Sequence, residues 1–153
     1  MSIQLSELVP GYRADLAAAI AAMPASQLLG LRVVGFAPGL SVIELPIRHE
    51  ITFDGLIVQG GIVGTLADYA AVSAAIVAKG EGWFGSTINF QVHNLDHARG
   101  QKLIAIGRCV RSSSRTGLGH AEVYATQSDT HTLVATAMAG CQYIEPLKRT
   151  TPD

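Results

Sequence analysis

One carboxylate stands inside the most apolar stretch of the chain. From Ile62 to Ala78 the only strongly polar side chains are Thr65, Asp68 and Ser73, and the stretch follows the glycine pair Gly60-Gly61. An ionised carboxylate in apolar surroundings is costly unless a partner, a hydrogen bond or water stabilises it. A helix that begins at two glycines presents free backbone N–H groups and the positive end of its dipole to a developing negative charge. An acid and an anion-binding turn together indicate acyl chemistry.

Size and composition limit the classes of protein that this chain can be. Its 153 residues are enough for one domain with a real core. Hydrophobic residues make up 48% of the chain and charged residues 15%, which indicates that other subunits cover part of the surface. The net charge of −1, without any Lys/Arg cluster, argues against a nucleic-acid partner.

Cysteine and histidine show no metal-binding spacing. Cys109 and Cys141 fall in separate predicted strands, and the five histidines are scattered. We therefore expect two free thiols in a reducing cytosol, no metal and no cofactor. Residues 1–10 lack the pattern of a secretory signal, and the apolar run is short for a membrane span and carries Asp68 near its middle. The expectation is a cytoplasmic protein without a membrane-spanning helix.

The order of predicted elements indicates an α+β protein. A helix at about residues 10–23 ends at Pro24, and a polar tail follows residue 144. Between them lie predicted strands at 27–36, 40–47, 86–93, 102–113, 119–127 and 132–144, and a long helix at 61–79. Short loops predict an antiparallel meander of the last four strands. A helix that is apolar almost all round is best buried by a curved sheet, so we expect one domain over residues 1–153, with its core at about 27–144.

Four features resemble the hotdog-fold acyl-CoA thioesterases, and most closely the phenylacetyl-CoA thioesterase type. They are Gly60-Gly61, the run Leu66-Ala67-Asp68-x-Ala70, the strand opening Phe84-Gly85-Ser86 and the order of elements. The match covers roughly residues 27–144 and its motif is moderately specific. The resemblance implies a single hotdog domain, in which a curved antiparallel sheet wraps around one long central helix. It also implies hydrolysis of acyl-CoA to a free carboxylic acid and coenzyme A.

The same resemblance implies roles for four catalytic residues. In that family the helix usually follows His-Gly-Gly, a backbone N–H of this turn polarises the thioester carbonyl, and an acid nine positions after the His is nucleophile or general base. Asp68 lies nine positions after Gln59 and matches the acid, while Gly60 matches the oxyanion-binding glycine. Ser86 matches a serine that helps to place the attacking water. Gln59 stands in place of the His, and its amide can donate a hydrogen bond but cannot carry a proton.

Six further residues are expected near the substrate, and each also has an ordinary structural interpretation. Asp54 falls near a family Asn or Gln in the preceding loop, Gly61 and Thr65 share the helix with Asp68, and Arg115 lies where relatives hold the phosphates of coenzyme A. Trp83 and Phe84 are candidates for a wall of the acyl or pantetheine channel. Core packing, helix packing or a solvated turn would explain the same residues.

Helix geometry indicates a site shared between two subunits. Gly60 and Asp68 are eight residues apart, which corresponds to about 12 Å along a helix axis. One carbonyl cannot easily lie within about 3 Å of the Gly60 N–H and also near that carboxylate. The site becomes reasonable if Gly60 and Asp68 come from different protomers. The resemblance implies the same arrangement, a homodimer with two shared sites or a homotetramer.

Three alternatives stay open at this point. Asp68 could be a structural acid that caps a backbone or pairs with an arginine. Gln59 in place of His would also fit a non-catalytic module that binds acyl-CoA. A hotdog hydratase or dehydratase is a weaker alternative, because such enzymes need a His near the start of the helix and no His lies between Glu50 and Gln91. The sequence does not choose between acyl groups, between dimer and tetramer, or between attack by Asp68 and attack by water.

Overall fold

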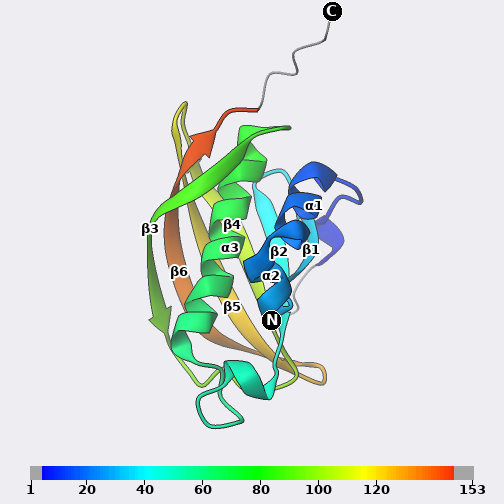
Figure 1. The fold of residues 1–153 in the computed structure, drawn as a ribbon, viewed down its shortest axis with the longest axis vertical. Helices are drawn as coiled ribbons and strands as arrows, with labels where there is room; N and C mark the ends of the chain where they lie inside the picture. The colour runs from blue at the N-terminus through cyan, green and yellow to red at the C-terminus, as the bar shows by residue number, and fades with distance from the viewer. Residues whose placement is uncertain (1–4, 147–153) are drawn as a thin grey trace, which may run out of the picture.

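One long helix, α3, runs along the concave side of a six-stranded antiparallel sheet, as Figure 1 shows. The computed structural model describes residues 5–146, so most of the predicted polar tail at 145–153 lies outside the described residues. The helical elements are η1 (Leu5–Glu7), α1 (Ala14–Ala22), α2 (Pro24–Leu29), η2 (His49–Ile51) and α3 (Gly60–Lys79). The strands are β1 (Arg32–Ala37), β2 (Leu40–Pro46), β3 (Phe84–Asn94), β4 (Lys102–Ser112), β5 (Thr116–Gln127) and β6 (Thr130–Ile144). The predicted α+β hotdog architecture is confirmed.

Small residues let α3 lie directly on the sheet. A Cβ added at Gly107 of β4 would overlap the carbonyl oxygen of Ala70, and one added at Gly119 of β5 would overlap that of Ala71. The alanines and glycines on the facing surfaces therefore set the distance between helix and sheet. By length and composition α3 could cross a membrane, but 67% of its apolar window is buried inside the fold, so the run serves as a core helix.

The sheet order β1-β2-β4-β5-β6-β3 corrects one prediction. Strands β4, β5 and β6 form the predicted meander, but β3 pairs with β6 rather than with β4. The segment 95–101 carries the chain from the end of β3 across to the start of β4, so it is not a hairpin loop. As a result β3 is an edge strand, and its outer edge presents unpaired backbone groups.

The N-terminal part holds two helices where the sequence predicts one. Pro24 ends α1, but it also occupies the first turn of α2, a position that tolerates proline because no backbone N–H is needed there. The helix α2 takes up the first part of the predicted strand at 27–36, and β1 begins only at Arg32. The pair α1–α2 lies beside α3 (Figure 1).

Candidate functional site

Asp68 lies near the middle of α3 and is held by one hydroxyl. Thr87 Oγ1, on β3, donates to the Asp68 carboxylate at 3.1 Å from Oδ1 and 3.0 Å from Oδ2. Burial raises the pKa of the Asp68 carboxyl, and the Thr87 hydrogen bond offsets part of that rise. Within residues 5–146 the ion pairs involve the acids Asp15, Glu44 and Glu7, so Asp68 is not held by an arginine there. An acid without a cationic partner is the pattern of a reactive group rather than of a structural salt bridge.

The carboxylate borders a mostly apolar cavity of about 310 Å³. The cavity lies between α1, α3 and the start of β3, and its apolar walls include Leu16, Ile20, Val72, Ile76 and Phe84. A larger hollow of about 630 Å³ lies among the loops near Arg48, Asp96 and Arg99. The charged side chains of that hollow are exposed to solvent, whereas burial desolvates the Asp68 carboxylate and raises its pKa. The smaller cavity is therefore the candidate active site.

Two neighbouring residues of β3 have different relations to Asp68. Ser86 borders the cavity, as does Thr87, but the hydroxyl that contacts the carboxylate belongs to Thr87. Successive strand residues point to opposite faces of the sheet, so the Ser86 side chain points away from α3. Gly85 supports this assignment, because a Cβ added there would meet Ile76 of α3. Thr87 is therefore the residue of β3 that contacts the acid, while Ser86, which we expect to help place the attacking water, borders the same cavity.

The turn before α3 is held by Gln59. Its Oε1 accepts a hydrogen bond from Ile62 N–H at 3.2 Å, which makes Gln59 the N-cap of the helix. The amides of Gly60 and Gly61 precede the first intrahelical donor, and no described group accepts from them. The side chain of Asn94 lies against Gly60, since a Cβ added at Gly60 would be 3.1 Å from Asn94 Nδ2. The turn thus offers two free N–H groups beside a side-chain amide.

The other predicted substrate residues divide between the cavity and the rest of the molecule. Phe84 lines the cavity, and Thr65 donates its hydroxyl to the Gly61 carbonyl at 3.0 Å, inside its own helix. Asp54 accepts from Leu56 N–H and Ile57 N–H and so stabilises its own loop. These placements leave Phe84 as the predicted substrate residue that reaches the acid's cavity.

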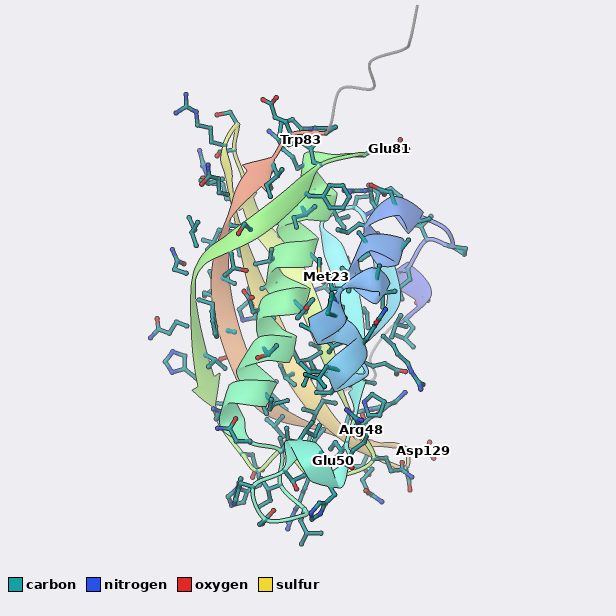
Figure 2. The ribbon with its side chains drawn as sticks, in the orientation of Figure 1. Met23, Arg48, Glu50, Glu81, Trp83 and Asp129 are labelled. Carbon is teal, nitrogen blue, oxygen red and sulfur yellow. The ribbon has the colours of Figure 1, made fainter. Side chains whose placement is uncertain are left out.

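Trp83 and Arg115 lie near the C-terminal end of α3. The Trp83 carbonyl accepts from Arg13 at 2.8 Å, and its ring packs edge-on against Tyr143 and beneath Lys79. Figure 2 shows Trp83 near the C-terminal end of α3. Arg115 occupies the β4–β5 hairpin loop, where its carbonyl accepts from Tyr143 N–H. Neither residue borders the Asp68 cavity.

Sequence reasoning missed three features of this site. No sequence motif marks Thr87 or Asn94. Alternation along β3 places both on the side that faces α3 only when the register shift between Thr87 and Asn89 is taken into account. The cavity walls from α1 also lie outside the predicted core, which begins only at about residue 27. In the described part of the chain, no three His, Cys, Asp or Glu side chains gather in a group that could hold a metal.

Comparison with known proteins supports the fold. No family model and no curated protein matches the chain. A thioesterase family protein from Silicibacter pomeroyi has a similar structure, with a TM-score of 0.81 and 25% identity over 88% of this chain and 99% of that one. The thioesterase HI1161 from Haemophilus influenzae has a TM-score of 0.74 at 15% identity, covering 90% and 94% of the two chains.

A third similar structure is the PaaI protein of the phenylacetic acid degradation operon of E. coli. Its TM-score is 0.75 at 17% identity, over 87% of this chain and 93% of that chain. The similarity covers most of this chain and nearly the whole length of each of the three neighbours. The chain is therefore a hotdog-fold protein, and its structural neighbours include proteins named as thioesterases.

Proposed function

We propose that the protein hydrolyses acyl-CoA thioesters to a free carboxylic acid and coenzyme A. In this proposal Asp68 of one protomer is the nucleophile or the general base, and the Gly60 N–H of its partner binds the developing oxyanion. The observation that carries the proposal is the state of Asp68, a desolvated carboxylate that borders an apolar cavity and accepts a hydrogen bond from the Thr87 hydroxyl. The similar structures named as thioesterases support the same reaction class.

Desolvation suits Asp68 to this task. A carboxylate with a raised pKa is a stronger base than an ordinary aspartate, which suits Asp68 to take a proton from water. Thr87 orients the carboxylate toward the cavity without neutralising its charge. Asp68 either attacks the thioester carbonyl carbon, releasing the thiolate of coenzyme A and leaving an anhydride for water to cleave, or it takes a proton from the water that attacks.

The oxyanion donor must come from a second protomer. Along one helix Gly60 lies about 12 Å from Asp68, too far for both groups to serve the same carbonyl. The edge strand β3 offers the route to a partner, because it presents unpaired backbone groups together with the exposed apolar side chains of Ile88 and Phe90. Pairing of two β3 strands would bring the Gly60 turn of one protomer toward the cavity of the other. The arrangement is a homodimer, which can further associate to a tetramer.

Mixing two inactive variants tests both the roles of Asp68 and Gly60 and whether the two residues of one site come from different protomers. Asp68→Ala removes the acid, and Gly60→Pro removes the N–H at a helix position that accepts proline, next to a residue already in extended conformation. Each variant alone should lose about 10²-fold or more of kcat. Random mixed dimers should regain about a quarter of the wild-type sites, because half the dimers are mixed and one of their two sites is intact. Recovery of no activity after verified subunit exchange contradicts a shared site.

The alternative of a non-catalytic acyl-CoA binding module keeps one supporting observation. Gln59 serves as a helix cap and has no group that titrates near neutral pH, so this turn cannot supply a proton in catalysis. Tight binding of acyl-CoA by the wild-type protein without release of free thiol would favour the binding module and contradict the hydrolase.

A further inference from the structure

We infer that the N-terminal helix pair α1–α2 forms the end wall of the acyl pocket and restricts the substrates to thioesters of compact, mainly apolar acids. This inference rests on the proposed function and adds to it the substrate class and a specificity-determining segment. The residues that carry the restriction are Leu16, Ile20 and Met23, which face α3 across the cavity that Asp68 borders.

The walls of the cavity are apolar at the side away from the acid. Leu16 and Ile20 of α1 are almost completely buried, and together with Val72 and Ile76 of α3 they line the cavity that Asp68 borders. Met23 stands between α1 and α2, and Figure 2 shows it where the helix pair meets α3. An acyl group whose thioester carbonyl sits at Asp68 would therefore extend toward α1.

The volume of the cavity limits the length of that acyl group. A cavity of about 150 Å³ is known to hold benzene, and the volume of about 30 Å³ that one water molecule occupies in the liquid is a scale for one non-hydrogen atom. At about 310 Å³ this cavity has room for roughly ten such atoms, a ring with a short arm or a chain of eight to ten carbons. A sixteen-carbon chain would have to displace α1.

Polar contacts hold the helix pair in place. Ser26 Oγ of α2 donates to Tyr69 Oη of α3 at 3.2 Å, and Met23 Sδ lies 3.7 Å from the same phenol oxygen. At the other end of α1, Arg13 donates to the carbonyls of Ile76 and Gly80 at the end of α3. Because both ends are fastened to α3, the wall does not simply swing aside for a longer chain.

The test compares acyl-CoA substrates of two, eight, twelve and sixteen carbons, and phenylacetyl-CoA, in a thiol-release assay. Met23→Ala enlarges the pocket and Met23→Trp fills it, while Leu28→Ala changes a side chain of α2 that is 76% exposed and does not border the cavity. The wild type should cleave the twelve- and sixteen-carbon substrates at least about tenfold less efficiently than the eight-carbon one. Met23→Ala should raise the ratio of twelve-carbon to eight-carbon kcat/KM by about tenfold, Met23→Trp should lower it, and Leu28→Ala should leave it unchanged.

Two results overturn the inference in distinguishable ways. If hydrolysis is observed but the chain-length profile is the same in the wild type and both Met23 variants, the acyl group binds elsewhere and only the pocket assignment fails. If the wild type cleaves none of the thioesters, the proposed function itself fails and the assignment fails with it. Melting temperatures of all variants show whether a changed profile reflects the pocket or a loosened helix pair.

Discussion

Thr87 donates its hydroxyl to both carboxylate oxygens of Asp68, with Oγ1 at 3.0 and 3.1 Å from them. A single O–H shared between two oxygens stabilises the charged form of the acid, which opposes the effect of burial on its pKa. The contact joins the central helix to the edge strand. It therefore links the reactivity of the acid to the position of the strand through which we propose that two protomers meet.

Removing this hydroxyl should shift the pH dependence of catalysis. In Thr87→Val the Asp68 carboxylate loses its donor, so its pKa should rise further and the acid limb of kcat/KM should move to higher pH. Thr87→Ser keeps the donor and should restore the wild-type limb. A pH–rate profile of the three proteins measures the shift.

The neighbouring serine supplies the control for that experiment. Ser86 points to the opposite face of the strand, so Ser86→Ala should leave the acid limb where it is in the wild type. A shift in Ser86→Ala together with an unchanged limb in Thr87→Val would contradict the assignment of the hydroxyl to Thr87.

The charge of Asp68 should reduce stability at neutral pH. Because its folded-state pKa lies above that of the unfolded chain, the folded protein binds more protons between those two values. The free energy of unfolding should therefore fall as pH rises through this window and stay lower above it. Asp68→Asn should be more stable than the wild type at neutral pH, and the difference should shrink as pH falls through the folded-state pKa of Asp68 toward the ordinary aspartate pKa of about 4.

Asp54 should have the opposite effect on how the free energy of unfolding depends on pH. Backbone N–H groups of Ile57 and Leu56 hold the pKa of the Asp54 carboxyl below its usual value. The stabilisation of the folded state by the ionised Asp54 carboxylate is present above the unfolded-state pKa and is lost as pH falls through the folded-state pKa. Asp54→Asn should therefore be less stable than the wild type at neutral pH. Urea unfolding between pH 3 and 8 compares the two variants. If both substitutions stabilise the protein at neutral pH, or both destabilise it, the opposite pKa shifts of Asp68 and Asp54 are contradicted.

The central helix and the fold class could be predicted from the sequence because their signals are local. A long apolar run without a polar face must be buried on all sides, and alternating strands after it supply the sheet. The pairing of β3 with β6 is different, because it joins residues about fifty positions apart and no local pattern records it. The contact of α1 with the cavity is also between residues far apart in the sequence, so no local pattern predicts it.

The contact of Thr87 with Asp68 could not be predicted from the sequence for a specific geometric reason. Simple alternation places Thr87 on the face opposite to Phe90 and Val92. The strand register shifts between Thr87 and Asn89, and this irregularity adds one residue to β3. As a result Thr87 shares the helix side with Phe90 and Val92, both of which lie close to Gly64 of α3. A bulge of this kind exchanges the faces of a strand without changing its composition.

Arg115 should affect recognition of coenzyme A and not the chemical step. Its loop is fastened to the end of α3 by Lys79, whose ammonium donates to the carbonyls of Ser113 and Ser114. If Arg115 binds a phosphate of the substrate, Arg115→Ala should raise KM for acyl-CoA several-fold, to about tenfold. KM for the matching N-acetylcysteamine thioester, which lacks the nucleotide, should not change. Arg99→Ala, an exposed arginine in the larger hollow, is the control, and an equal effect on both thioesters would contradict the phosphate contact.

Arg13 should be among the most important side chains for stability. Its guanidinium is almost fully buried and donates to the carbonyls of Ile76, Gly80 and Trp83, and to the carboxylate of Asp15. In Arg13→Ala these acceptors lose their donor while they remain largely shielded from water, which should cost about 2–4 kcal/mol of unfolding free energy.

A matched pair of variants separates this burial effect from loss of charge. Arg13→Lys keeps the charge, but one ammonium cannot reach all of these acceptors, so it should recover only part of the stability. Arg32→Ala removes an arginine whose side chain is 70% exposed and 4.0 Å from Glu44, and it should cost less than about 1 kcal/mol. Urea denaturation of the three variants measures the difference. Equal losses in Arg13→Ala and Arg32→Ala would mean that Arg13 does not hold α1 against the end of α3, and the end wall of the cavity would then lack its main anchor.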